Sequence, residues 1–453
     1  MAEYISILGA GLAGSEAAWQ AAERGVKVKL YEMKPIKYTP AHHTPGFGEL
    51  VCSNSLRSDA VSNAVGLLKE EMRALNSLIM QAADATRVPA GSALAVDRVL
   101  FSEYITDRVR NHPNIEVIVT ECDRLPDDGI TVIATGPLTS DVMADYIRDE
   151  LGCGGLHFFD AAAPIVDAES INMDIAFFAS RYDKGDADYI NCPMTHEQYD
   201  AFYSALISAE EAALKEFDRE TQKDLKVFEG CMPVEVMARR GYDTLRYGPL
   251  KPVGLIDPRV GKEFYAVVQL RKENKEGTMY NLVGFQTHLT FPEQRRVFRL
   301  IPGLENAEFL RYGVMHRNTY LNSPGLLGAD YAMLDRPQVY FAGQMTGVEG
   351  YVESAASGLV AGLNAARQAK GQDALIFPRT TMIGAMAQYV QNGGVGPFVP
   401  MNANFGIIQM PEKRVKGGKA ARNAVIAETA VATIQAMLPE IQSQRSDRER
   451  GTL

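Results

Sequence analysis

The sequence predicts an α/β fold built on a parallel sheet and interrupted by an inserted α+β domain. Three observations predict it. An apolar run at residues 4–8 ends in closely spaced glycines and leads into a helix-compatible stretch at 15–24 and a second strand at 26–32. Two later apolar runs, at 131–136 and 339–343, end in glycine in the same way. Between them, residues 155–330 mix strand-like runs at 264–270 and 280–285 with an acidic helix around 195–220.

We therefore expect a discontinuous first domain of residues 1–155 and 330–453, with residues 156–329 as an inserted substrate domain. A chain of 453 residues is long enough for two or three domains. Residues 34–59 are rich in Pro, Gly, His and Ser and predict a long loop. Apolar residues spaced by three and four from Val61 to Ile79 predict one helix face, and a further helix is expected at 353–370.

Composition narrows the class of protein. Hydrophobic residues make up 46% of the chain and charged residues 23%, which is typical of a folded soluble protein. With no run of 18 apolar residues and no basic signal region, we expect a cytoplasmic protein without a membrane or an obligate protein partner. The net charge of -10 argues against nonspecific coating of nucleic acid, although a local basic site remains compatible with it. Five scattered cysteines predict neither a disulfide framework nor a metal site.

The first glycine turn predicts a Rossmann-type dinucleotide site. Its residues fit G-x-G-x-x-G between a strand and a helix, where missing side chains let the backbone approach a pyrophosphate. Glu32 ends the second strand, where a carboxylate accepts hydrogen bonds from a ribose. NAD, S-adenosylmethionine and FAD each satisfy this pattern. The residues assigned to the turn are Gly9, Ala10, Gly11, Leu12, Ala13 and Gly14.

Two later segments favour FAD among these ligands. The strand that ends at Thr135 and Gly136, and the glycine-rich stretch at 342–350, resemble further elements of glutathione-reductase-like flavoproteins. In such proteins the late turn and its helix hold the ribityl phosphate side of FAD. The residues assigned to this second part of the cofactor site are Thr135, Gly136, Gly343, Gln344, Gly347, Gly350 and Tyr351.

Four segments are closer to one family than the fold alone requires. They read Val-Cys-Ser-Asn-Ser-Leu-Arg-Ser at 51–58, Phe-Glu-Gly-Cys-Met-Pro-Val-Glu at 228–235, Leu-Arg-Tyr-Gly-Pro-Leu-Lys-Pro-Val at 245–253 and Gly-Gln-Met-Thr-Gly-Val-Glu-Gly-Tyr-Val-Glu at 343–353. With them the chain resembles the folate- and FAD-dependent tRNA (uracil-5-)-methyltransferases, the TrmFO family, from residue 4 to about residue 440. The sister family MnmG, or GidA, which modifies the wobble uridine, shares the FAD domain but carries a different late turn.

The resemblance implies a reaction that gives two cysteines a purpose. Position 5 of uracil is a poor nucleophile, and addition of a thiolate to position 6 makes it enolate-like. In this family methylenetetrahydrofolate passes its carbon to reduced flavin, NAD(P)H supplies electrons, and the T-loop uridine in the T-arm of tRNA becomes 5-methyluridine. By resemblance Cys231 attacks the uracil and Cys52 is the thiol beside the flavin, although the two roles are exchangeable. Activation by neighbours is expected, because a thiol with an ordinary pKa of about 8.5 is mostly protonated at neutral pH.

The remaining site assignments concern folate and RNA. His288 and Tyr351 are the candidates for binding the pterin of the folate. Basic residues close to Cys231 and near the C-terminus are candidates for holding RNA phosphates. These are Arg239, Arg240, Lys413, Arg414, Lys416 and Lys419.

Other residues keep a structural interpretation. His42 and His43 are expected to be solvated loop histidines. Cys122, Cys153 and Cys192 are expected to act as small buried hydrophobes.

Four alternatives stay open at the level of sequence. One is an MnmG-like modification of a wobble uridine. Ribosomal RNA is a substrate for a close relative that uses the same chemistry. A flavin oxidoreductase acting on a small molecule would need neither Cys231 nor folate. A flavin-containing RNA-binding protein would need affinity for RNA but no turnover.

Overall fold

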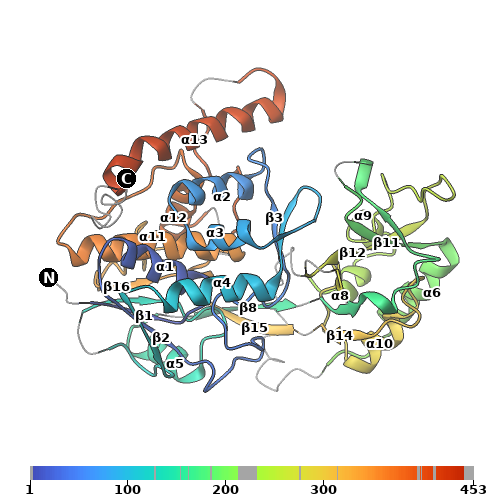
Figure 1. Cartoon of the computed structure of the whole chain (residues 1–453), viewed down its shortest axis with the longest axis horizontal. Coiled ribbons are helices and arrows are strands. Elements are labelled where there is room, and N and C mark those ends of the chain that lie inside the picture. The colour runs from blue at the N-terminus through green and yellow to red at the C-terminus, as the bar shows by residue number, and fades with distance from the viewer. Residues whose placement is uncertain are drawn as a thin grey trace.

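The computed structural model describes residues 4–126, 129–153, 155–161, 163–183, 186–212, 232–274, 277–313, 315–394, 398, 400–411 and 415–442. Figure 1 shows two lobes: a larger one around a parallel sheet, and a smaller one, on the right, around an antiparallel sheet. The chain passes from the first lobe to the second and back again.

The first lobe contains a five-stranded sheet in the order β16-β7-β1-β2-β6, and each neighbouring pair is parallel. Strands β1 and β7 are buried along their whole length, as expected for a parallel sheet covered on both faces. The strands expected near 4–8, 26–32, 131–136 and 339–343 are confirmed, and the Rossmann-type prediction with them. The bounds are Ile5–Leu8 (β1), Val28–Glu32 (β2), Ile115–Val119 (β6), Ile130–Ile133 (β7) and Val339–Phe341 (β16).

Helices α1 (Leu12–Glu23) and α11 (Tyr351–Ala369) cross at very short range on one face of this sheet. A Cβ atom at Gly358 would overlap the backbone of Ala13, and one at Gly362 would overlap that of Ala17. Only glycine permits this approach. The crossing holds the first glycine turn and the late glycine turn, each of which leads into one of these helices, side by side.

The segment between β2 and β6 departs from the sequence prediction in two places. The loop expected over 34–59 ends in a short strand, β3. The helix face expected from Val61 to Ile79 is two helices, because Asn76 adopts a left-handed conformation (φ 60°) and the Ser77 hydroxyl caps the next helix at the Met80 amide. The elements are Ser55–Ser58 (β3), Ala64–Ala74 (α2), Leu78–Ala85 (α3), Arg87–Val88 (β4), Ala93–Val96 (β5) and Arg98–Arg110 (α4), with β3, β5 and β4 forming a small sheet.

The second lobe is built on a six-stranded sheet in the order β10-β11-β12-β13-β9-β14, with antiparallel pairs. It has a hydrophobic core of its own. The expected strand-like runs at 264–270 and 280–285 correspond to β12 and β13. The acidic helix expected around 195–220 is confirmed only as far as Ile207, as α6, because the chain turns at Ser208 and Glu211 pairs with Leu289 in a β-bridge. Residues 213–231 lie outside the described part of the chain. The bounds are Ile165–Asp167 (β9), Phe177–Ala179 (β10), Tyr189–Met194 (β11), Ala266–Lys272 (β12), Met279–Leu282 (β13), Phe309–Arg311 (β14), His196–Ile207 (α6), Val234–Arg239 (α8), Thr244–Tyr247 (α9) and Phe291–Phe298 (α10).

An antiparallel ribbon of β8 (Gly155–Ala161) and β15 (Met315–Leu321) links the two lobes. Helix α5 (Asp141–Asp149) precedes it. Leu321 and Leu327 pack into the core of the first lobe. This packing favours a return to the first lobe at the ribbon, a few residues before the expected boundary at 329/330. The division into 1–155 with 330–453 and 156–329 therefore remains a proposal.

The C-terminal part adds helices α12 (Met382–Asn392) and α13 (Gly418–Gln442), the latter at the top of Figure 1. Within the described residues, α13 is the one helix with the length and hydropathy of a membrane span. Its Ile426, Ala430 and Ile434 are buried in the core of the first lobe, and Asn423 donates to the Ser62 carbonyl. Through these contacts one face of α13 packs against the first lobe.

Candidate functional site

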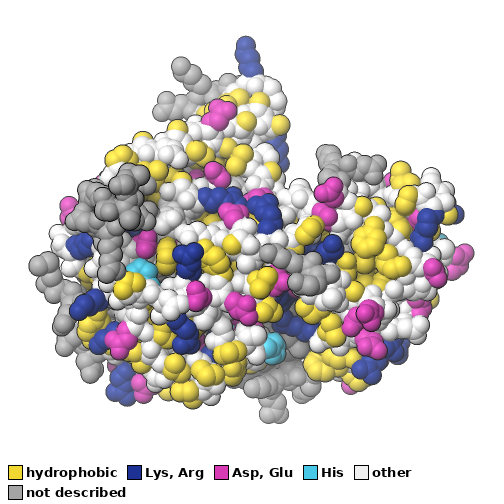
Figure 2. All heavy atoms as spheres, viewed as in Figure 1, with side chains coloured by type: hydrophobic (Ala, Val, Ile, Leu, Met, Phe, Trp, Pro, Cys, Tyr) yellow, Lys and Arg dark blue, Asp and Glu magenta, His cyan; other side chains and the backbone are white. Residues whose placement is uncertain are grey.

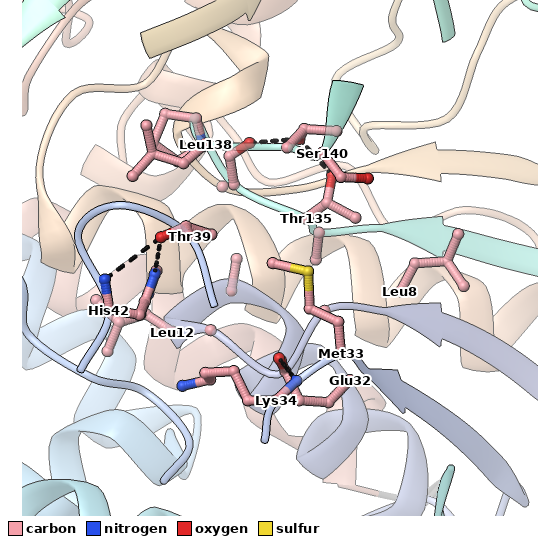
Figure 3. Close-up of a pocket in the computed structure, with 18 of the residues that line it drawn as sticks. Leu8, Leu12, Glu32, Met33, Lys34, Thr39, His42, Thr135, Leu138 and Ser140 are labelled. Atoms are coloured by element: carbon pink, nitrogen blue, oxygen red, sulfur yellow. Dashed lines mark hydrogen bonds between the residues drawn. The ribbon is translucent and has the colours of Figure 1, made fainter. Parts of the chain in front are cut away.

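A long cavity runs along the carboxyl edge of the parallel sheet, from the end of β2 to the loop of Cys52. Figure 3 shows its wall: Leu12, Glu32, Lys34 and His42 converge from one side, Thr135 and Leu138 from the other. This edge is where open α/β sheets bind ligands. The wall is made of Leu8, Gly9, Gly11, Leu12, Ala13, Tyr31, Glu32, Met33, Lys34, Thr39, Ala41, His42, Glu49, Val51, Cys52, Thr120, Glu121, Cys122, Ala134, Thr135, Gly136, Pro137, Leu138, Thr139, Ser140, Met143, Gly343, Gln344, Tyr351 and Ser354.

The first glycine turn borders the cavity and has the backbone geometry that suits an anion. Gly9 has a φ of 96°, and a Cβ there would lie 2.7 Å from the Ala134 carbonyl oxygen; a Cβ at Gly14 would overlap the Gly9 carbonyl. Both glycines are therefore needed for the chain to pack. Gly11 differs, because a Cβ there would meet no atom within 4 Å. The open space above Gly11 faces the N-terminus of α1, where backbone amides and the helix dipole favour a pyrophosphate.

Glu32 fixes the geometry of this turn. Its carboxylate accepts from the amides of Ala10 (2.7 Å) and Lys34 (2.9 Å) and is almost fully buried. Each carboxylate oxygen has a second lone pair, so a ribose hydroxyl can still bind.

Lys34 is a wall residue that the sequence prediction missed. Its ammonium donates to the Gly46 carbonyl and lies 3.7 Å from Glu49, and burial lowers its pKa. The sequence does contain a signal for Lys34, because it stands two positions after Glu32, just beyond the end of a predicted strand.

Two histidines in the loop before Cys52 have different surroundings. His42 lies in the cavity wall, where its Nδ1 is 2.6 Å from the Thr39 hydroxyl, so the expectation of a solvated loop histidine is wrong for His42. The reason is that the loop folds back over the glycine turn, with Gly48 donating to the Ala10 carbonyl. His43 is exposed, as expected.

The three cysteines expected to be small buried hydrophobes differ in their burial. Cys153 and Cys192 are buried, and burial raises the pKa of both thiols. Cys122 is only half-buried and lies in the cavity wall near Thr139 and Ser140. Burial and nearby carboxylates raise its pKa to about 11, so it is held as a neutral thiol.

The late glycine turn contributes unequally to the cavity. Gly343 (φ 86°) and Gln344 lie in its wall, and Gln344 donates to Glu349 at 2.6 Å. Gly347 and Gly350 serve the fold instead. A Cβ at Gly347 would overlap the Phe398 ring, and one at Gly350 would overlap the Glu353 carboxylate.

Tyr351 and Cys52 meet at one end of the cavity. The amides of Cys52 and Ser53 donate to the Tyr351 hydroxyl oxygen (2.7 and 3.2 Å), and this hydroxyl donates to the Cys52 sulfur at 2.9 Å. Burial raises the pKa of Tyr351 well above its ordinary value, which keeps the phenol protonated as a donor. A hydrogen bond to sulfur favours the thiolate form of a cysteine.

Three arginines hold the loop that carries Cys52. Arg98 of α4 donates to the Leu50 carbonyl (2.9 Å), and Arg311 of β14 donates to the Val51 carbonyl. Arg271 of β12 donates to the Ser53 hydroxyl (2.7 Å) and to Asn54 (3.0 Å). Burial lowers the pKa of Arg271 and of Arg311, and the charge of Arg98 adds to this effect. Arg98 is also paired with the buried Glu273 at 2.6 Å. The remaining positive charge of Arg271 and Arg311 near this loop is of the kind that favours a thiolate.

The other predicted residues lie elsewhere. Cys231, Lys413 and Arg414 are outside the described residues. His288 is not in the cavity wall; it is buried in the second lobe with its Nδ1 3.7 Å from Glu211, which also pairs with Arg239. Hydrogen bonding from His288 and Arg239 lowers the pKa of Glu211 to about 2.

The predicted RNA-binding residues within the described chain are exposed and form two separate groups. Arg239 and Arg240 end α8 in the second lobe. Lys416 and Lys419 lie at the start of α13 in the first lobe, beside Arg422.

Comparisons with known proteins agree with this geometry. The family model of glucose inhibited division protein A matches residues 4–373. The methylenetetrahydrofolate–tRNA-(uracil-5-)-methyltransferase TrmFO of Acetivibrio thermocellus is 61% identical over 95% of this chain and 98% of its own length. The proteins of the same name from Brevibacillus brevis (59%; 95% and 97%) and Listeria monocytogenes (56%; 97% and 100%) are similar to it as well. Among solved structures, Aquifex aeolicus GidA matches 99% of this chain and 76% of its own, with a TM-score of 0.69 at 16% identity, a likeness of fold.

Proposed function

This chain belongs to the TrmFO family, within the wider family of glucose inhibited division protein A, and from that premise we propose that it methylates uridine in tRNA. The proposed product is 5-methyluridine in the T-loop. Methylenetetrahydrofolate is the proposed carbon donor, FAD the cofactor and NAD(P)H the reductant, in the cytoplasm. The overall reaction balances as methylenetetrahydrofolate, uridine, NAD(P)H and one proton giving tetrahydrofolate, 5-methyluridine and NAD(P)+.

The observation that carries the proposal is the Cys52–Tyr351 pair at the end of a dinucleotide cavity. A flavin oxidoreductase that acts on a small molecule by simple hydride transfer does not require a cysteine that receives a phenol hydrogen bond near several arginines. A thiol-dependent group transfer needs this arrangement, because the thiolate is the reactive form.

The cavity residues fit FAD. The open space above Gly11 at the start of α1 suits the pyrophosphate, and Glu32 suits a ribose. Gly343 and Gln344, at the turn before α11, are the proposed neighbours of the ribityl phosphate side. Bound FAD would supply the redox chemistry that turns a folate-borne carbon into a methyl group.

The chain's own residues have distinct proposed tasks. Cys231 adds through sulfur to C6 of the uracil, and the π electrons of the C5–C6 bond move toward the carbonyl oxygen at C4, so that C5 attacks the one-carbon unit. Loss of the proton from C5 then breaks the bond between the transferred carbon and its donor nitrogen and leaves an exocyclic methylene on C5. A hydride equivalent, ultimately from NAD(P)H, adds to this methylene, and the sulfur is expelled from C6 as the methyl group forms. Cys52, held by Tyr351, is the proposed thiolate beside the flavin and a candidate acceptor for that proton.

The structure supports one of the two proposed folate contacts and leaves the RNA contacts as proposals. Tyr351 keeps its role as a folate neighbour, because its ring lines the cavity. The pairing of His288 with Glu211 gives its proposed pterin contact no support. Arg239, Arg240, Lys413, Arg414, Lys416 and Lys419 are proposed to bind phosphates of the T-arm.

One assay tests the proposal. Purified protein is mixed with NAD(P)H, methylenetetrahydrofolate and an unmodified tRNA transcript, and the nucleosides are analysed for 5-methyluridine. Cys52→Ala and Cys231→Ala should each give no product, whereas Cys153→Ala, at a buried thiol outside the cavity wall, should retain activity. NAD(P)H oxidation without product would favour an oxidoreductase, and product on a ribosomal RNA fragment alone would move the substrate to ribosomal RNA.

A further inference from the structure

A stack of aromatic rings reaches the surface of the second lobe beside β14. Tyr312 stacks on Phe291 (ring centroids 4.7 Å apart, planes 14° apart) and on Phe309 (5.4 Å, 15°). Phe309 in turn contacts Phe298, which is fully buried. We call Phe291, Arg295, Arg299, Phe309 and Tyr312 the aromatic–arginine platform.

The outer end of the stack is exposed. Phe291 begins α10 and retains 50% of its accessible surface, although the ring is fixed by Tyr312 and a proline follows it. A rigid aromatic face that stays open to solvent loses little conformational entropy when another flat ring stacks on it.

Guanidinium groups surround this face. A shallow groove is lined by Phe291, Pro292, Arg295, Arg296, Arg299 and Tyr312, with no acidic residue among them. Arg296 is paired with Glu293 at 2.6 Å, whereas Arg295 donates to the Tyr312 hydroxyl and Arg299 to the Ala307 carbonyl. Within the described chain, neither Arg295 nor Arg299 has a carboxylate partner within 4 Å.

The charge of this groove runs against that of the whole protein, which is -10. Figure 2 shows hydrophobic, cationic and acidic side chains next to one another at the lower right, over the part where Figure 1 places α10. Exposed stacking rings among arginines suit unpaired nucleotides: the base stacks on the ring, and the guanidinium groups bind phosphate. A shallow groove also fits a strand of RNA better than a small molecule, which binds in concave sites.

The platform is joined to the candidate active site through the polypeptide chain. Arg311 comes directly before Tyr312 in the chain, and its guanidinium donates to the carbonyl of Val51, the residue next to Cys52. A nucleotide on the platform would therefore bind to a segment whose neighbouring residue, Arg311, contacts the loop that carries the candidate thiol.

We infer, on the basis of the proposed function, that the aromatic–arginine platform binds an unpaired nucleotide of the RNA substrate near the target uridine. The base stacks on the outer face of Phe291, and Arg295 and Arg299 hold the adjoining phosphates. RNA is recognised in this way where loops expose unstacked bases.

The test compares Phe291→Ala and Arg295→Ala with two matched controls. Phe178→Ala removes a phenylalanine of similar exposure (45%) from β10 of the same sheet, and Arg148→Ala removes an exposed arginine from α5. Binding of unmodified tRNA transcript is measured over a series of salt concentrations. The KM for methylenetetrahydrofolate, the FAD content and the melting temperature are measured on the same samples.

Phe291→Ala should weaken tRNA binding about five- to hundredfold with an unchanged salt slope, because one stacked base is lost. Arg295→Ala should lower the salt slope by about one, because one phosphate contact is lost. Phe291→Trp should restore binding, which separates stacking from misfolding.

Equal tRNA affinity in Phe291→Ala and Phe178→Ala would overturn the inference while wild type still makes 5-methyluridine. A rise only in the KM for methylenetetrahydrofolate would assign the platform to the folate, and a change only in self-association would assign it to a second copy of the chain. Absence of 5-methyluridine in wild type would contradict the proposed function itself.

Discussion

At Tyr351 a single hydroxyl joins two segments that lie about 300 positions apart in the chain. It receives the amides of Cys52 and Ser53 and gives its proton to the Cys52 sulfur. The amides fix the position of the oxygen, so the direction of its proton toward sulfur is fixed as well. The residue therefore orients Cys52 and supplies a hydrogen bond to its sulfur.

Tyr351→Phe removes this hydrogen bond and leaves the ring. A hydrogen bond to a charged group contributes about 1.5–3 kcal/mol, so alkylation of Cys52 by iodoacetamide at neutral pH should slow at least tenfold. The site of alkylation is read by peptide mass spectrometry, with Cys122 as the internal control. An unchanged rate at Cys52 would mean that Tyr351 only fills space.

Gly11 and Gly14 allow the nucleotide site to be tested separately from the fold. Gly11→Val places its side chain in open space, so the protein should fold with an ordinary melting temperature but without FAD. Gly14→Val places it against the Gly9 carbonyl and should prevent folding or lower stability by several kcal/mol. FAD absorbance and thermal denaturation check both; Gly11→Val protein that keeps FAD would place the cofactor elsewhere.

Residues that belong to a local sequence motif can be predicted from the sequence. Residues that matter because folding brings them into contact cannot. Gly9, Glu32 and Cys52 stand in motifs and lie in the cavity wall. Arg98, Arg271 and Arg311 come from three separate elements, and only the folded chain brings them to one loop. Nothing in their spacing distinguishes them from other arginines.

At the scale of elements, apolar runs predict strands well because all strands of a parallel sheet are buried on both faces. Helix breaks are harder to predict. The apolar spacing continues across residues 75–77, yet the left-handed Asn76 and the Ser77 cap end one helix and begin another. The spacing of apolar residues shows which face of a segment is buried. It does not show a turn after which the same face stays buried.

Helix α12 begins on a buried carboxylate from another helix, and this contact makes stability depend on pH. Glu71 of α2 accepts from the amides of Met382 (2.7 Å) and Ile383 (2.8 Å). Burial outweighs these two bonds and raises its pKa to about 8. Between pH 4.5 and about 8 the folded protein keeps a proton that the unfolded chain releases, so stability falls as pH rises through this window.

Glu71→Gln keeps an acceptor oxygen without titrating. Relative to this variant, wild type should lose on the order of 1–4 kcal/mol of unfolding free energy between about pH 5 and pH 8. Denaturant unfolding at both pH values measures the difference, and Glu70→Gln, at the exposed neighbour, should follow wild type. Parallel pH dependence of Glu71→Gln and wild type would contradict the assignment.

At the scale of the whole molecule, the Cys52 loop is where the two lobes meet. Arg271 and Arg311 reach it from the sheet of the second lobe, and Asn54 of the loop donates to the Lys272 carbonyl at 2.7 Å. The general division into two lobes could be read from the change in sequence pattern. The β8–β15 ribbon and this junction could not, because they depend on how the lobes pack.

Arg311→Ala should loosen the loop at the Cys52 end of the cavity and leave the glycine turn and Glu32, the proposed nucleotide site, in place. FAD content should remain that of wild type, and kcat for 5-methyluridine should fall about tenfold or more, as expected for one lost hydrogen bond from a charged group. Arg148→Ala, far from the loop in sequence and paired only with neighbours on its own helix, is the control. An Arg311→Ala enzyme with normal kcat would contradict a role for the junction in catalysis.

The origin of the methyl carbon tests the central claim most directly. Wild-type protein is supplied with NAD(P)H, unmodified tRNA and methylenetetrahydrofolate carrying ¹³C in its methylene group, in the presence of unlabelled S-adenosylmethionine. The account predicts 5-methyluridine that is one mass unit heavier, formed by wild type and absent with Cys52→Ala. Unlabelled 5-methyluridine, or labelled product made equally well by Cys52→Ala, would contradict it.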